Sequence, residues 1–218
     1  MKQIISTVIV ATLAMLGTTA TLFAAPQAKS STPLSKNSDL QRHTAYYGSE
    51  TAVPKVPSVM LSMQEDALCK LKPGQTMPTI ELPKLDGGNA KLSGLLGKKA
   101  TVVVFWKDDH RMTAEELADL GPDVVERFGK DGVEVICIAV DTKPEAAKEA
   151  LNKSGAKFTT LLDADGNAFA QVGKEALPRT FVLDSSGKIA WFDISYTLAT
   201  RREIRETLRA LTGDSKEK

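Results

Sequence analysis

Cysteine and histidine are scarce in this sequence. Its 218 residues contain two of each. Cys69 and Cys137 are far apart along the chain, so no C-x-x-C pair is present. The two histidines, His43 and His110, do not supply the three or four well-spaced ligands of the usual zinc site. These shortages argue against a dithiol redox centre and against a bound zinc ion, and we expect no cofactor.

An excess of charge of one sign is also missing. The 28 Lys and Arg residues nearly balance the 27 Asp and Glu residues, which leaves a net charge of +1. Proteins that bind nucleic acid rely on a basic surplus, so we expect no nucleic-acid partner. No internal repeat is visible, which excludes a solenoid. The proportions of 42% hydrophobic and 25% charged residues fit one ordinary globular domain with extensions.

The chain begins with a segment typical of a secretory signal peptide. Lys2 provides the positive start, Ile4 to Leu16 the apolar centre, and small residues follow before Ala25. We therefore expect a periplasmic or secreted protein. Because no charge appears between Lys2 and Lys29, the alternative is an uncleaved anchor, the one case in which we expect membrane contact. The predicted organisation is a signal peptide (1–24), a flexible tether (25–70), a folded domain (71–213) and a charged tail (214–218).

Apolar runs alternate with helix signals in the folded part, which predicts an α/β domain. Thr101–Trp106 and Val133–Val140 have the continuous apolar character of strands buried on both faces. A crossover helix follows the second run, with Asp141 or Thr142 as its N-cap and Gly155 past its end. The other predicted elements are a strand at Phe158–Leu162, a short helix at Asn167–Val172, a hairpin turn at Ser185–Gly187, and a last helix at Thr200–Leu211 opened by a Thr200/Glu203 capping box.

The charged turn Lys107–Met112 lies between the first strand and a helix, where α/β folds commonly place their chemistry. Thr113 and Glu116 have the spacing of a capping box, so the helix is predicted to begin at Thr113. Gly121 and Pro122 should break or kink it.

Three separated motifs resemble a known family. Phe105–Leu120 resembles the active-site segment of the thioredoxin-like TlpA/ResA group of extracytoplasmic thiol-disulfide oxidoreductases. Leu177–Asp184 (LPRTFVLD) is similar to the group's cis-proline strand, and Lys72–Pro78 is similar to its entry motif. The resemblance spans about Pro73 to Leu211. It implies a thioredoxin-like fold, with a central mixed sheet flanked by helices.

The chain departs from that family at the reacting atoms. In a gapless comparison the two family cysteines fall on His110 and Thr113. The segment is also similar to the peroxiredoxin motif of the AhpC/TSA-related redoxins, and there the reactive cysteine falls on Met112. Thiol exchange requires a thiolate, which none of these side chains provides. Compared with the family it resembles, the chain is therefore predicted to have a degenerate redox site.

The resemblance also implies that Leu177-Pro178 is a cis peptide facing the His110 turn. We expect this face to bind an extended segment of a protein or peptide partner, although the proline could equally serve only to shape the strand entry. Arg179 would add positive charge, so alanine at Arg179 and His110 should weaken partner capture with little change in thermal stability. The candidate binding residues are Trp106, Asp109, His110, Arg111, Leu177, Pro178 and Arg179.

Three hypotheses of function follow. The leading one is a non-catalytic binding module outside the cytoplasm. The second is a thiol-disulfide oxidoreductase or antioxidant protein that works through an exposed, reactive Cys69 or through a partner's thiol, since Cys137 is expected to be an inert core residue. The third is an acid–base or metal-dependent site at Asp108, Asp109 and His110.

Overall fold

The computed structural model describes residues 54–108 and 111–213. They belong to one compact unit, Gly48–Lys218. The predicted signal peptide (1–24), the tether up to residue 53 and the charged tail (214–218) lie outside the described residues.

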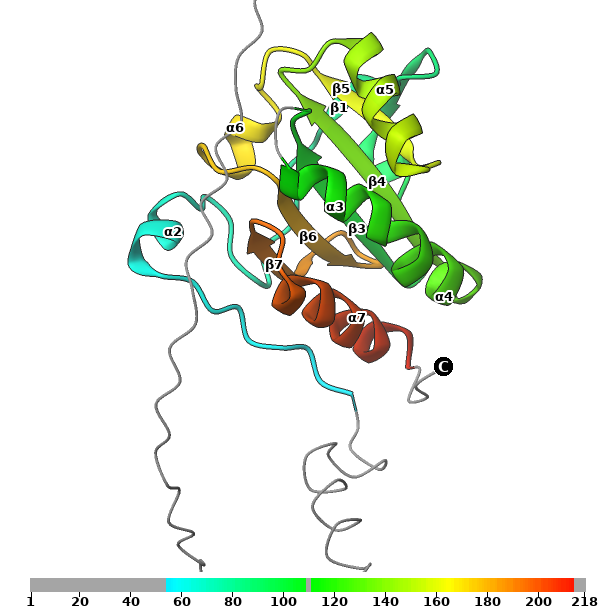
Figure 1. The fold of residues 1–218 in the computed structure, drawn as a ribbon. Helices are drawn as coiled ribbons and strands as arrows, with labels where there is room; N and C mark the ends of the chain where they lie inside the picture. The colour runs from blue at the N-terminus through cyan, green and yellow to red at the C-terminus, as the bar shows by residue number, and fades with distance from the viewer. Residues whose placement is uncertain (1–53, 109–110, 214–218) are drawn as a thin grey trace, which may run out of the picture. The chain divides into compact units, whose positions relative to one another are not determined.

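A five-stranded sheet forms the centre of the described domain (Figure 1). Its strands are β3 (Ala100–Trp106), β4 (Val133–Val140), β5 (Thr159–Asp163), β6 (Arg179–Asp184) and β7 (Ile189–Ile194). Their spatial order is β5-β4-β3-β6-β7. The first three strands are parallel, whereas β6 runs antiparallel to β3 and β7 antiparallel to β6. The predicted α/β architecture with a mixed sheet is therefore confirmed.

Helices cover one face of this sheet, in front of it in Figure 1. They are α3 (Arg111–Leu120), α4 (Glu126–Phe128), α5 (Pro144–Ser154) and α7 (Leu198–Thr212). A short π-helical segment, η2 (Gly121–Val125), joins α3 to α4, and a 3-10 turn, η3 (Gly129–Asp131), follows α4. The other face packs against α6 (Phe169–Val172), the hairpin of β1 (Glu81–Pro83) and β2 (Asn89–Lys91), and the turn η1 (Leu92–Gly94).

The period of two in a strand divides the core into two clusters. Val102, Val104 and Trp106 of β3 lie in the cluster with α3, α5 and α7, whereas Val103 and Phe105 lie in the cluster with α6. All seven residues of β3 are buried, as predicted for a central strand covered on both sides.

The helix starts differ from the prediction. α7 is capped by Thr197, which forms a reciprocal pair with Thr200, and not by Thr200 with Glu203. Lys143 is the N-cap residue of α5 without a side-chain bond. Neither predicted cap is used, because Asp141 pairs with Lys107 and the Thr142 hydroxyl donates to the carbonyl of Val140. Sequence spacing found the helices but not their first residues.

The predicted capping box at Thr113 is also wrong. The helix α3 includes Arg111, so Thr113 lies inside its first turn, buried at 2% exposure. Glu116 is fully buried and turns towards the sheet instead of back to the amide of Thr113. The predicted break at Gly121 and Pro122 is confirmed, since η2 interrupts the helix there.

Residues 54–70, assigned to the tether, pack onto the domain where the structure describes them. Val56, Val59 and Leu61 contact the core. A short helix, α2 (Met63–Ala67), opens with a capping box between Ser62 and Glu65. The packed part of the chain therefore begins before Leu71.

Candidate functional site

The charged turn leaves the sheet at the carboxyl end of β3. Lys107 Nζ lies 2.7 Å from Asp141 Oδ2, and the Thr142 hydroxyl is 3.4 Å from Asp108 Oδ1. Asp109 and His110 lie outside the described residues. Within the described ranges, no three His, Cys, Asp or Glu side chains come close enough to hold a metal ion. Of the three residues named in the acid–base and metal hypotheses, the structure therefore describes only Asp108.

Leu177-Pro178 is a cis peptide, as predicted. Pro178 is buried, and its carbonyl accepts a hydrogen bond from the amide of Ser195 at 2.9 Å. Leu177 is partly exposed and packs against the core cluster that contains α6. In the described ranges, neither the amide nor the carbonyl of Leu177 has a backbone partner. The main chain of Leu177 is therefore unpaired within the described ranges.

Two predicted members of the binding face are in the core instead. Trp106 and Arg179 are both 0% exposed. Strand alternation explains Arg179, because Thr180 contacts Glu116 of α3 and the preceding residue must therefore point to the opposite face of the sheet. The expected positive charge beside Pro178 thus does not come from Arg179.

Arg179 instead holds two backbone segments together. Its Nη1 donates to the carbonyl of Leu68 at 3.1 Å, and its Nη2 donates to the carbonyl of Lys174 at 3.2 Å. The guanidinium lies 5.4 Å from the centre of the Phe169 ring. A β-carbon at Gly173 would come within 1.6 Å of Nη1, so glycine leaves the space that this side chain needs. These contacts give Arg179 a structural role, so we now expect Arg179→Ala to reduce stability, contrary to the prediction from the sequence.

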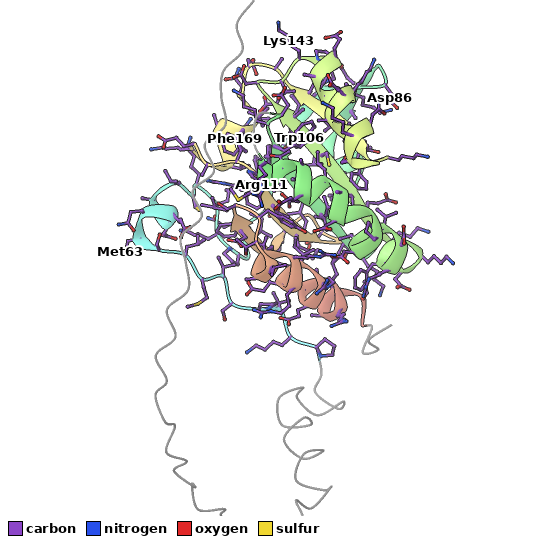
Figure 2. The ribbon with its side chains drawn as sticks, in the orientation of Figure 1. Met63, Asp86, Trp106, Arg111, Lys143 and Phe169 are labelled. Carbon is purple, nitrogen blue, oxygen red and sulfur yellow. The ribbon has the colours of Figure 1, made fainter. Side chains whose placement is uncertain are left out.

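Arg111 is the one basic member of the predicted face that stays exposed among the described residues (Figure 2). Its side chain is 89% exposed, and its Nε lies 2.9 Å from Glu115 Oε1, one turn along α3. Of the described members of the predicted face, Arg111 is therefore exposed, Leu177 is partly exposed, and Trp106, Pro178 and Arg179 are buried.

The structure brings together a buried polar cluster that sequence reasoning missed. The Thr180 hydroxyl donates to Glu116 Oε1, and burial raises the pKa of Glu116 to about 8 despite this bond. Thr180 pairs with Asp193 on the adjacent strand β7, and burial raises the pKa of Asp193 as well. Glu116 Oε2 and Thr113 Oγ1 have no hydrogen-bond partner in the described part of the chain. The signal available in the sequence was the helical spacing of Glu116 with Leu117 and Leu120, which places it on the apolar side of α3.

Neither cysteine has the setting of an activated thiol. Cys137 is 0% exposed in β4, and burial raises its pKa, as expected for an inert core residue. Cys69 is partly buried rather than exposed, and its Sγ donates to the carbonyl of Glu65 at 3.3 Å. Burial raises the pKa of Cys69 more than the positive charge of Arg179 lowers it.

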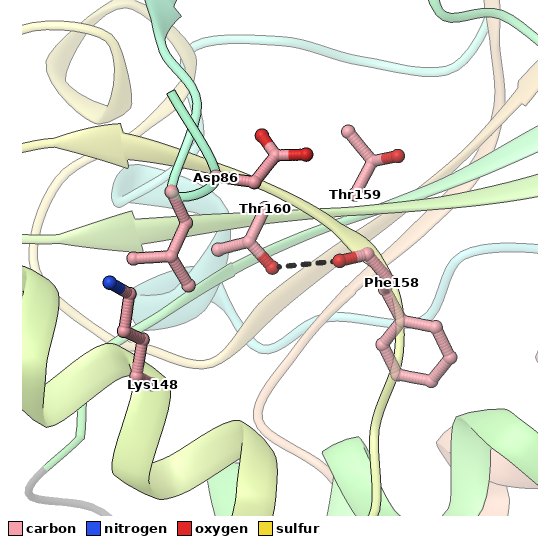
Figure 3. A pocket seen from close by; sticks show the side chains of 6 residues that line it. Asp86, Lys148, Phe158, Thr159 and Thr160 are labelled. Carbon is pink, nitrogen blue, oxygen red and sulfur yellow. Dashed lines mark hydrogen bonds between the residues drawn. The ribbon is translucent and has the colours of Figure 1, made fainter. Parts of the chain in front are cut away.

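Two hollows lie beside α5. One, of about 300 Å³, separates α3 from α5 and includes Thr113, Ala118 and Ala150 in its walls. The other, of about 430 Å³, lies next to the edge strand β5, between Asp86, Lys148 and Phe158 (Figure 3). Thr113, which the gapless sequence comparison aligns with the second family cysteine, therefore lines a groove towards α5.

Comparison with known proteins identifies the family. The model of the AhpC/TSA family matches residues 73–192, more than half of the chain. The chain belongs to the AhpC/TSA family. This AhpC/TSA protein is 30% identical to a chloroplastic peroxiredoxin Q from Populus jackii over 185 residues. The match covers 82% of this chain and 84% of the relative. It is 26% identical to the thiol-disulfide oxidoreductase ResA of Bacillus anthracis over 120 residues, covering 55% and 68%.

A solved structure extends the comparison to the fold. The AhpC/TSA domain superimposes on a secreted disulfide oxidoreductase of Mycobacterium tuberculosis, homologous to E. coli DsbE, with a TM-score of 0.53 and 22% identity. The match covers 61% of this chain and 96% of the other. Together these likenesses confirm the predicted resemblance to ResA-type redoxins and the thioredoxin-like fold.

Proposed function

We propose that this AhpC/TSA protein is a non-catalytic, extracytoplasmic module that binds an extended segment of a protein partner at the Leu177–Pro178 loop. The supporting observation is that, within the described ranges, the amide and carbonyl of Leu177 have no backbone partner. Neither cysteine of this redoxin fold has the setting of an activated thiol. Cys137 is in the core, and Cys69 is partly buried with a raised pKa. The gapless sequence comparison places His110 and Thr113 at the cysteines of the group that the chain resembles, which supports a site without thiol exchange.

The proposed contact is main-chain pairing at Leu177. The Pro178 carbonyl is already bonded to Ser195, so pairing with a partner would involve the residue before it. Hydrogen bonds to an added strand supply affinity, and neighbouring side chains supply selectivity. Arg111, which is exposed at the start of the described α3, would favour an acidic partner residue at the edge of this face.

Two observations support a location outside the cytoplasm. Residues 1–24 have the composition of a signal peptide, and the M. tuberculosis protein that shares the fold is described as secreted. In the described ranges, no helix is long and apolar enough to cross a membrane.

Insulin reduction tests the absence of catalysis. The mature chain should show no dithiol-dependent turnover, and Cys69→Ser should behave identically. The combined variant His110→Cys with Thr113→Cys would restore a C-x-x-C and should gain activity, which serves as the positive control. Turnover in the unmodified protein that survives Cys69→Ser would contradict the proposal. Turnover that Cys69→Ser abolishes would establish the alternative, an oxidoreductase or antioxidant role through Cys69.

Site-specific photocrosslinking tests partner binding in the producing cell. A photoreactive phenylalanine at Leu177 should give one discrete adduct. The same residue at Leu198, which is 84% exposed at the start of α7, is the matched control and should give none. Equal adducts at both positions, or none at Leu177, would contradict the proposed face.

A further inference from the structure

Three arginine side chains surround one buried carboxylate where α3 gives way to α4. Asp123, 8% exposed, lies in the π-helical segment η2. Its Oδ2 accepts from Arg201 Nε and from Arg205 Nη1, the latter at 3.2 Å, and its Oδ1 is 3.9 Å from Arg127 Nε. The arginines come from α4 and α7, which lie on the same side of the sheet in Figure 1.

The three guanidinium groups are not used equally. Arg201 also bonds Asp119 Oδ2 at 2.9 Å, so it bridges two carboxylates and joins α7 to α3. Arg205 makes one bond, and Arg127 makes only the long contact. Both remain partly exposed, at 28% and 40%. In the described part of the chain, they therefore keep planar N–H donors with no acceptor.

The local charge favours an added anion. Three guanidinium groups face the two carboxylates of Asp119 and Asp123, and Asp119 also accepts from the hydroxyl of Tyr196 at 2.9 Å. Burial raises the pKa of Asp123, but the hydrogen bond and the charges of the arginines outweigh it and hold that pKa below its ordinary value. A carboxylate from outside would meet a surplus of positive charge in a partly dehydrated site.

We propose that Arg127 and Arg205 form a second docking surface, which binds an acidic segment of a protein partner. The unused N–H groups match the planar geometry of a carboxylate, the group that all three arginines already contact at Asp123. A peptide with several carboxylates offers one to each arginine, whereas a single inorganic anion offers one group to both. This surface is separate from the Leu177–Pro178 loop, so it does not depend on the proposed function.

Binding of a labelled peptide tests this surface. The probe is a short fluorescent peptide of glutamates, and a glycine–serine peptide of equal length is the reference. Arg127→Gln and Arg205→Gln should each weaken binding about threefold to fivefold, the range expected of exposed charge pairs. Lys91→Gln is the control, because Lys91 is an exposed basic residue of β2, which packs on the other face of the sheet, and it should leave binding unchanged. An equal loss in all three variants would show non-specific attraction and overturn the proposal.

Two further measurements separate docking from a structural role. Because Arg127 makes only the long contact with Asp123, Arg127→Gln should change the melting temperature little, whereas Arg201→Gln, which removes bonds to two carboxylates, should lower it. An equal loss from both would make the cluster purely structural. Inorganic phosphate, or vesicles of anionic lipid, should compete weakly with the peptide. If phosphate or the vesicles displaced the labelled peptide at a concentration below the one at which the peptide half-saturates the protein, the choice of a protein partner would be overturned.

Discussion

Glu116 is an acid whose pKa is raised by folding, and this gives stability an unusual dependence on pH. Its pKa is about 8 in the folded protein and 4.5 in the reference state. Between these values the unfolded chain loses the proton and the folded chain keeps it. The stabilising contribution is therefore complete below pH 4.5 and declines as the pH rises towards 8. Above that window the carboxyl is ionised in both states.

We expect Glu116→Gln to remove this dependence. The variant should match the wild type near pH 5 and exceed it increasingly up to pH 8, by at most about 1.4 kcal/mol for each pH unit. Urea unfolding at several pH values measures the difference. Glu115→Gln is the control, because Glu115 is 48% exposed on the same helix and should show no such trend. A constant difference between wild type and Glu116→Gln would show that Glu116 is ionised in the folded protein.

Thr113 provides a second test at the level of one atom. Its hydroxyl is buried and has no partner in the described ranges, so Thr113→Val should raise the free energy of unfolding by about 1 kcal/mol. The predicted cap would have required the opposite sign, a loss of about 0.5 to 2 kcal/mol. Thr207→Val is the matched control. It removes a buried hydroxyl that donates to the carbonyl of Glu203 at 2.7 Å, and it should not stabilise.

At the scale of elements, Arg179 connects the segment around Leu68 to the loop around Lys174 through hydrogen bonds to their two carbonyls, and Gly173 leaves room for its side chain. Gly173→Ala should cost about 2 kcal/mol, because its methyl group would displace the guanidinium by steric overlap. The φ of Gly173 is −171°, which any residue adopts, so backbone strain is not the cause. Gly121→Ala is the control, since a β-carbon there meets nothing within 4 Å.

A double-mutant cycle shows whether the two residues act together. Combining Gly173→Ala with Arg179→Met should cost less than the sum of the single changes, because the methyl group has nothing to displace once the guanidinium is gone. Thermal unfolding of the four proteins measures this coupling. Strict additivity would mean that the contact at Gly173 does not hold Arg179 in place.

Local sequence rules were sufficient for the strands and for the broken helix. The apolar runs of β3 and β4 indicated strands buried on both faces. The proline of Gly121-Pro122 cannot continue a regular α-helix, so the break was predictable. The caps were not predictable, because threonine at positions 113, 197 and 200 has similar local signals and tertiary packing decides which one is a cap. The direction of Arg179 could have been inferred from alternation along β6, but its two carbonyl partners could not, since one of them lies 111 residues away.

At the scale of the whole molecule, a thioredoxin-like sheet separates two apolar clusters, and each holds one cysteine. Cys137 lies in the cluster with α3, α5 and α7, whereas Cys69 packs against the cluster with α6. The family resemblance predicted the sheet and its helices. It did not extend to residues 54–70, which lie before its motifs and have no periodic pattern. Val56 and Val59 of this segment pack against the first cluster, and Val59, Leu61 and Cys69 pack against the second.

The separation of the two thiols predicts a domain whose stability is independent of reduction. A disulfide requires Cα atoms within about 7 Å and β-carbons directed towards each other. Two cysteines packed on opposite faces of a sheet do not meet this geometry, and both are free. The urea midpoint should therefore be the same with and without dithiothreitol, and alkylation in denaturant without prior reduction should label both thiols. A lower midpoint on reduction would require a bond between molecules through Cys69, and it would appear as a disulfide-linked dimer that Cys69→Ser removes.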